Sequence, residues 1–260
     1  MKNMPVIKFS FMKRTYAALA ILFVSFSLYG QVPPWLETFR DAVYGQEISV
    51  NAAEHLFQEA DRQARENLNG SALYAMLSRC EYLLGKVYQD NNRNNEAITH
   101  YEKGISWAEQ SLAEGGSASV RAEAHEMIAS HVGQLCMIRS RSWVMANGLK
   151  VEDNAKKARQ LDGRNAGALY LLASRWAFGP GPFGDPKRGI IELEAILNGQ
   201  AVLEKDTYFN VYSALSYACL RLNRNQEALS WAQKSLTLYP TNKFAIDLQS
   251  QIQQKLRTAK

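Results

Sequence analysis

The spacing of large and small residues between Leu84 and Gly104 constrains the fold of this chain more than any other feature of its sequence. Within this stretch, the gaps between the large and the small residues are typical of two antiparallel helices that pack closely. The same order of large and small side chains returns 131 residues later, counted between the first members of the two sets. The first set is Leu84, Gly85, Tyr88, Ala97, Tyr101 and Gly104, and the second is Leu215, Ser216, Cys219, Ala228, Ala232 and Ser235, followed by Pro240. A repeated helical hairpin predicts a stacked array with an extended surface rather than a catalytic pocket.

These two segments, 78–109 and 209–240, resemble the tetratricopeptide repeat family, whose unit of about 34 residues is a helix–turn–helix. Two weaker copies lie between them, one ending in Ala155, Ala158, Leu161 and Gly163, and one starting at Leu169, Leu172, Ala173 and Trp176. A still weaker hairpin with Ala53, Phe57 and Ala60 precedes them. The resemblance implies an all-α fold, an α-solenoid of stacked antiparallel hairpins. A plain helical bundle is the alternative for the middle of the chain.

The apolar residues of residues 31–260 recur at intervals of three and four, which predicts helices throughout. Asn94 and Asp185 are placed to cap helix starts, and the loop from Phe178 to Asp185 contains glycines and prolines that interrupt any helix. The last helix repeats Phe244, Leu248, Ile252 and Leu256 on one side, which is typical of a C-terminal capping helix. The predicted helices are 35–44, 51–67, 71–90, 94–113, 118–146, 150–161, 165–177, 186–198, 206–222, 224–238 and 241–257.

The first thirty residues have the composition of a secretory signal peptide. Lys2, Lys8, Lys13 and Arg14 precede an apolar run from Tyr16 to Leu28, which is shorter than the ~20 residues of a membrane span. Cleavage after Ser27 or Gly30 fits the small residues there, and an uncleaved anchor is the alternative. No cysteine follows the run, so a lipoprotein anchor is not expected. The predicted division is a signal peptide (1–30), N-terminal helices forming a degenerate repeat (31–77), the array (78–240) and the capping helix (241–260).

The net charge of +5 belongs mainly to that signal segment. Removing its four basic residues from the 30 of the whole chain leaves 26 against 25 acidic residues, and no dense Lys/Arg block remains. We therefore expect no nucleic-acid partner, and membrane contact only through an uncleaved signal. Cys80, Cys136 and Cys219 are predicted to be packing thiols, although one disulfide of unspecified pairing stays open for an exported chain.

No catalytic, metal or cofactor motif is present in the sequence. His125 and His131 lie six residues apart, not at the spacing of a zinc-binding His-Glu-x-x-His helix, and are predicted to be surface or packing residues. The glycines of the 178–185 loop lack the Gly-Lys-Ser/Thr of a phosphate-binding loop. We expect no enzyme and no cofactor.

In the resembled family, the first helix of each hairpin lines the concave side of the array. Carried onto this chain, that side holds an aromatic groove with basic and polar neighbours. The predicted partner-binding residues are Arg79, Tyr82, Lys86, Trp143, Tyr170, Ser174, Phe178, Asn210, Tyr217 and Arg221. Aromatic and arginine side chains are frequent anchors of binding surfaces. A tight superhelix or a folded-back terminus that fills the groove with these rings is the equally weighted alternative.

The sequence therefore predicts an exported, non-catalytic scaffold, located in the periplasm or elsewhere in the cell envelope, that binds a protein or peptide there. The alternative is an accessory subunit that holds a small, partly apolar ligand for uptake. It rests on a loose similarity to exported repeat proteins associated with tripartite (TRAP-type) transporters. A cavity ringed by Trp143, Tyr170 and Phe178 is expected for that second function, and an open groove for the first.

Overall fold

The computed structural model describes residues 32–258, and every regular element assigned within them is an α-helix. The signal peptide and its cleavage site predicted from the sequence lie outside these residues. No helix in the described part of the chain combines the length and the apolar character of a membrane span. The helices are α2 (Pro34–Gly45), α3 (Val50–Asn67), α4 (Gly70–Asp90), α5 (Asn94–Glu114), α6 (Ala118–Ile138), α7 (Arg141–Asn147), α8 (Leu149–Leu161), α9 (Ala166–Phe178), α10 (Pro186–Leu197), α11 (Lys205–Arg221), α12 (Asn225–Leu238) and α13 (Lys243–Thr258).

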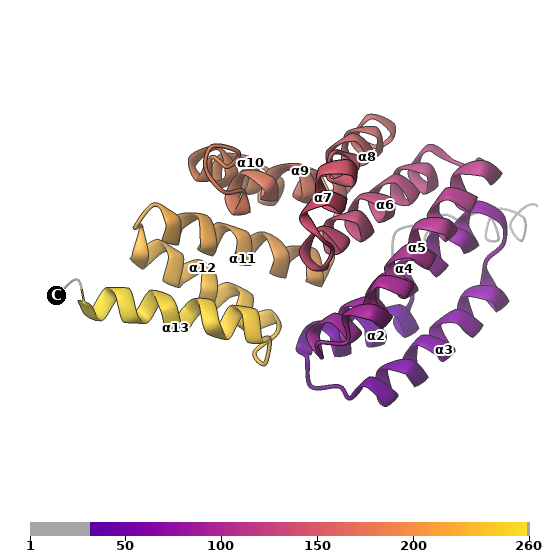
Figure 1. The fold of residues 1–260 in the computed structure, drawn as a ribbon, viewed down its shortest axis with the longest axis horizontal. Helices are drawn as coiled ribbons and strands as arrows, with labels where there is room; N and C mark the ends of the chain where they lie inside the picture. Colours follow the sequence, from indigo (N-terminus) through magenta and orange to yellow (C-terminus); the bar gives the residue numbers. More distant parts are fainter. Residues whose placement is uncertain (1–31, 259–260) are drawn as a thin grey trace, which may run out of the picture.

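The helices pack as successive antiparallel hairpins, as the resemblance implied (Figure 1). The pairs are α4 with α5, α6 with α8, α9 with α10, and α11 with α12, and α13 packs on the last pair. The hairpins follow an arc that runs from α3 past α6 and α9 to α13 (Figure 1). The first helices of consecutive pairs, α4, α6, α9 and α11, also contact one another. They therefore form the inner layer of the arc.

The small residues of the repeated motif set the distance between paired helices. A Cβ built on Gly85 of α4 lies 2.5 Å from the Tyr101 ring of α5, and Tyr101 is fully buried. In the C-terminal pair, Ser216 Oγ donates a hydrogen bond of 2.8 Å to the Ala228 carbonyl. Such close contacts are local to each hairpin, which explains why spacing along the sequence predicted both pairs.

A second close contact joins α5 to the next hairpin through a buried histidine. Gly104 leaves space for the His131 ring, and a Cβ on Gly104 lies 2.1 Å from two of its atoms. Ser78 Oγ donates to the Gly104 carbonyl at 2.8 Å, and His131 Nε2 lies 3.1 Å from the Ser78 carbonyl. Because the Ser78 proton is already committed, Nε2 carries the imidazole proton and donates it to Ser78. His131 is thus a packing residue, one of the two roles expected from its sequence.

Burial lowers the pKa of His131 to about 3. The folded protein therefore keeps this imidazole neutral at pH values where the unfolded chain, with an ordinary histidine pKa of ~6.5, takes up a proton. Its contribution to stability is present above the unfolded pKa and is lost as the pH falls. We expect the difference in unfolding free energy between the wild type and His131→Asn to shrink by about 1.4 kcal/mol per pH unit below pH ~6. Urea unfolding from pH 7 to 4.5 measures this difference. The comparison cancels titrations shared by both proteins, such as that of Glu126, whose pKa burial raises to about 7. A difference that stays constant with pH contradicts the assignment.

Three local predictions differ from the structure. The helix predicted over 118–146 ends at Ile138 and a new one starts at Arg141, because the Ser140 side chain accepts from the Trp143 amide and caps the second helix. Asn94 is the first residue of α5 and not its cap, whereas Asp185 caps α10 by accepting from the Arg188 amide at 3.1 Å. In α13, Leu248 and Ile252 are buried as expected, but Phe244 is 45% exposed and Ala245 takes its place in the core.

The three cysteines are free thiols in the described structure. Cys80 and Cys219 are buried among apolar residues, and burial raises the pKa of each thiol to about 12. A thiol with so high a pKa is unreactive near neutral pH. The packing role predicted for these two residues therefore holds in the fold.

Candidate binding surface

The N-terminal helix α2 lies against the inner layer of the arc. It contacts α4 and α11, the first and last helices of that layer, so that α2, α4, α6, α9 and α11 form a closed ring. Leu36, Phe39 and Val43 are at most 1% exposed, and they occur at the helical spacing of one apolar face. The concave side is therefore partly filled by the chain's own N-terminal helix.

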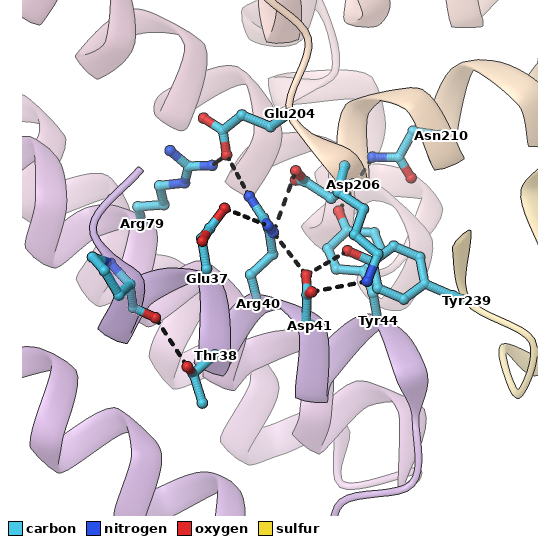
Figure 2. A network of polar contacts seen from close by, with 12 residues as sticks. Glu37, Thr38, Arg40, Asp41, Tyr44, Arg79, Glu204, Asp206, Asn210 and Tyr239 are labelled. Atoms are coloured by element: carbon cyan, nitrogen blue, oxygen red, sulfur yellow. Dashed lines mark hydrogen bonds and ion pairs between the residues drawn. The ribbon is translucent and has the colours of Figure 1, made fainter. Parts of the chain in front are cut away.

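Arg40 forms the polar centre of this contact (Figure 2). Its side chain is only 3% exposed, and it donates to Glu204 Oε2 at 3.0 Å and to Asp41 Oδ1 at 3.1 Å. Asp206 Oδ1 lies 3.8 Å away, and Arg79 of α4 donates to the same Glu204 oxygen. Burial alone would raise the pKa of Glu204, but the guanidiniums of Arg79 and Arg40 outweigh it and hold that pKa below its usual value. The cluster thus joins α2, α4 and the start of α11.

Tyr44 provides the aromatic part of the same contact. Its ring stacks on Tyr239 with centroids 5.4 Å apart and meets the edge of Phe209 at 5.8 Å. The Asn242 side chain donates to the Tyr44 carbonyl at 2.9 Å, and Tyr239 donates its hydroxyl to Asp41 at 2.8 Å. These contacts tie the end of α2 to the turn between α12 and α13. The two hydrogen bonds each join residues that are 198 positions apart in the sequence.

Three of the predicted groove residues are engaged with α2 and its partners. Arg79 pairs with Glu204, the Lys86 ammonium lies 5.3 Å from the centre of the Tyr44 ring, and Asn210 donates to the Tyr44 hydroxyl at 3.2 Å. Their polar groups are used within the molecule. The alternative of a folded-back terminus thus accounts for this part of the groove.

Four more predicted residues lie along the inner layer or beside it. Burial raises the pKa of both Tyr82 and Tyr170, and the Tyr82 hydroxyl accepts from Gln134 at 3.2 Å. Ser174 donates to the Leu171 carbonyl within its own helix, and Trp143 packs, half-buried, against two of the apolar core clusters. Tyr170 packs against the same core cluster as Tyr217, near the C-terminal end of the array.

The last three predicted residues lie together at the C-terminal end of the arc. Phe178 stacks on Tyr217 with centroids 5.0 Å apart and meets the edge of Phe244 at 6.4 Å. Phe178 is 38% exposed and Phe244 is 45% exposed. We call the three rings of Phe178, Tyr217 and Phe244 the aromatic shelf. Arg221 supports it by donating to the carbonyls of Ala177 at 2.8 Å and Gly179 at 2.7 Å. The shelf thus combines two predicted groove residues, Phe178 and Tyr217, with Phe244 of α13, and it exposes part of its aromatic surface to solvent.

Two hairpins of the chain match a known repeat family. The tetratricopeptide repeat model matches residues 82–111, which lie within α4–α5, and residues 209–242, which cover most of α11 and all of α12. The chain contains two tetratricopeptide repeats. No curated protein matches it. The unmatched middle of the chain, α6 to α10, nevertheless continues the same hairpin stacking. Repeats of this family suggest a protein-interaction scaffold.

Two of the surface hollows in the described part of the chain bear on the ligand-holding alternative. One, of about 480 Å³, lies between α2 and the start of α3, and the other, of about 390 Å³, lies between α8, α9 and α10. Neither is lined by Trp143, Tyr170 or Phe178. They do not supply the cavity expected of a ligand-holding transporter subunit, so that alternative stays a prediction.

Sequence reasoning missed Phe244 as a member of the shelf, and it offered a folded-back terminus as an alternative without identifying α2 as the helix that fills the concave side. The spacing predicts a core position for Phe244 because this residue continues the series of Leu248 and Ile252. The signal for α2 was present in the spacing of Leu36, Phe39 and Val43, which marks a helix with one buried face. Nothing in that spacing indicates which surface the face covers.

Proposed function

We propose that this protein is an exported, non-catalytic scaffold that holds a protein or peptide partner in the cell envelope, and that the partner docks on the aromatic shelf. The two tetratricopeptide repeats support the scaffold role. The observation that carries the site is the set of aromatic rings Phe178, Tyr217 and Phe244, of which Phe178 and Phe244 are 38% and 45% exposed, where the concave side is free of α2. The sequence of residues 1–30 supports export.

The shelf has the properties of a binding hot spot. Its three rings are held by one another, and Arg221 fixes the end of α9 from below through two backbone carbonyls. Rigid aromatic side chains supply large contact areas and lose little conformational entropy when a partner binds. A partner that lays an apolar or aromatic side chain between Phe178 and Phe244 covers the exposed part of these rings. The charged cluster around Arg40 is left intact by such binding.

Replacement of Tyr217 by alanine distinguishes a binding surface from core packing. If the shelf is a site, Tyr217→Ala retains most of the stability and loses a partner captured by the wild type from envelope extracts, because a truncated hot-spot residue costs about 2 kcal/mol or more of binding. Quantitative affinity capture and urea unfolding measure the two quantities. Tyr74→Ala is the matched control, since Tyr74 stacks on Trp107 of α5, away from the shelf. A loss of stability of about 3 kcal/mol or more shows core packing instead.

Export is tested separately by N-terminal sequencing of the protein recovered from the envelope fraction. We expect the mature chain to begin at Leu28 or Gln31, after cleavage at Ser27 or Gly30. An intact Met1 on envelope-associated protein contradicts cleavage and indicates the uncleaved anchor. Recovery from the cytoplasm alone contradicts export.

A further inference from the structure

The hollow between α8, α9 and α10 lies on the other side of the array from α2. The second helices of two successive hairpins, α8 and α10, flank it, and the first helix α9 forms its floor. Its volume of about 390 Å³ falls within the ~300–1,000 Å³ of small-molecule sites. We call it the Trp176 pocket. Its residues are distinct from those of the aromatic shelf, so an experiment that contradicts one of the two sites leaves the other untouched.

Trp176 forms one wall of this pocket together with two arginines. The guanidinium carbons of Arg175 and Arg188 lie 4.1 Å and 4.0 Å from the centre of the indole ring. Such distances are those of cation–π contacts, which hold both guanidinium groups beside the ring. Arg188 reaches Trp176 because the next residue, Gly189, allows α10 to approach α9 closely. A Cβ at Gly189 lies 2.8 Å from the Ala177 backbone nitrogen.

The loop that interrupts the repeat pattern builds this approach. Asp185, at its end, donates its amide to the Trp176 carbonyl at 3.0 Å and caps α10 through its side chain. The start of the loop is held from the concave side by Arg221. The glycine- and proline-rich segment is thus a fixed corner that places Arg188 over Trp176. This gives a structural role to the one sequence motif that the scaffold function leaves unexplained.

The remaining lining combines an apolar floor with an excess of positive charge. Leu172 and Ile196 are buried beneath the pocket, at 9% and 5% exposure. Four cations and two carboxylates surround them: Lys156, Arg159, Arg175 and Arg188, with Glu152 and Glu192. Glu152 is shared by Lys156 and Arg175, and Glu192 pairs with Arg188 at 2.7 Å. Arg159 forms no ion pair with any residue in the described part of the chain. The lining therefore carries two more positive than negative charges.

We propose that the Trp176 pocket binds a carboxylate that carries a short apolar or aromatic body. Guanidinium groups bind carboxylates with directional, charge-assisted hydrogen bonds, so Arg159 and Arg175 are placed to hold the anion. The apolar body then lies over Leu172 and Ile196, against the edge of Trp176. Both a free small acid and the C-terminal residue of a peptide offer this chemistry.

The indole N–H signal of Trp176 in a nitrogen-15 NMR spectrum reports on binding, and it is assigned by its absence in Trp176→Phe. The probes are 3-phenylpropanoate and its neutral amide. We expect the acid to shift this signal with a Kd of about 1 mM or tighter. The amide is expected to bind at least about tenfold more weakly, since it lacks the charge that the arginines recognise. Equal shifts by acid and amide, or no shift by the acid, overturn the proposal.

A pair of substitutions on one helix tests the role of Arg159. Both Arg159 and Lys157 are exposed on α8, but Lys157 does not line the pocket. Arg159→Gln is expected to weaken binding of the acid by about tenfold or more, while Lys157→Gln leaves it unchanged. If the two variants weaken binding equally, the acid responds to the general surface charge of α8 and not to Arg159, and the proposed site is overturned.

The source of the ligand is decided by a third probe, the acetylated peptide Ala-Ala-Phe with a free C-terminal carboxylate. Binding of this peptide more tightly than 3-phenylpropanoate assigns the pocket to peptide C-termini. Weaker binding of the peptide assigns it to free small acids. Either result supports the carboxylate chemistry, whereas peptide binding that persists after amidation of its C-terminus contradicts it.

Discussion

Replacing Arg40 by methionine is expected to lower the free energy of unfolding by about 3 kcal/mol, because it removes a buried cation that three partly buried carboxylates share. The expected loss lies at the lower end of the range for a broken buried ion pair, since Glu204 keeps Arg79 and Asp41 keeps Lys205. Arg40 is 3% exposed and serves Glu204, Asp41 and Asp206 at once. Methionine keeps much of the length and apolar volume of the side chain, so the loss reports mainly on charge. Urea denaturation followed by circular dichroism measures it. The transition is also expected to broaden or split, because Arg40 joins α2 to both ends of the ring.

Arg62→Met provides the matched control. Arg62 also pairs with two carboxylates, Glu59 and Glu66, but its side chain is 52% exposed on α3. Exposed pairs of this kind contribute about 0–1 kcal/mol, so the control is expected to lose no more than that. Comparable losses in the two variants would show that the Arg40 cluster is as well solvated as a surface pair, and the ring closure would then rest on its apolar contacts alone.

The ring closure could not be predicted from the sequence. The contacts within α4–α5 and α11–α12 involve residues 12 to 26 positions apart, such as Ser216 with Ala228 and Ser78 with Gly104, and they follow from repeat spacing. By contrast, Arg40 and Glu204 are 164 positions apart, and neither lies in a matched repeat. A charged residue at position 40 would ordinarily be assigned to the solvated face of an amphipathic helix. Its burial depends on partners that only the curvature of the array brings together.

The candidate site was half predicted for a related reason. Family spacing correctly places Phe178 and Tyr217 on the first helices of their hairpins, where they meet. It also places Arg79, Lys86 and Asn210 on the concave side, but it does not reveal that α2 uses their polar groups. The Trp176 pocket lies on the outer side, which repeat spacing does not describe. Its charges become a site only through the close approach of α9 and α10 at Gly189.

The self-filled ring also limits how a partner can bind. A partner that runs along the whole concave side must displace α2, together with four nearly inaccessible side chains and the Arg40 cluster. These four are Leu36, Phe39, Val43 and Tyr44. Burial of each such side chain is worth about 1.5–3 kcal/mol, so displacing α2 costs more than a typical peptide interface returns. A partner that uses the aromatic shelf avoids this cost. The geometry therefore favours local docking at the C-terminal end of the array.

Gly104→Ala is expected to cost about 3 kcal/mol, at the upper end of the range for overpacked cores. The added methyl group lies 2.1 Å from the His131 ring, which is fully buried and held by Ser78, so neither side has room to move. Gly133→Ala is the control of opposite sign. Gly133 is also inside a helix, but its added methyl group meets nothing within 4 Å, so alanine is expected to stabilise the fold by about 0.5–1 kcal/mol.

The double variant Gly104→Ala with His131→Ala completes the argument. If the clash with the imidazole is the cause, removing the ring restores space for the methyl group, and the two losses are expected to be smaller together than their sum. Urea unfolding of the four proteins gives this coupling directly. Additive losses would show that α5 and α6 move apart in Gly104→Ala instead. In that case the backbone of the array, and not the His131 ring, sets the distance between successive hairpins.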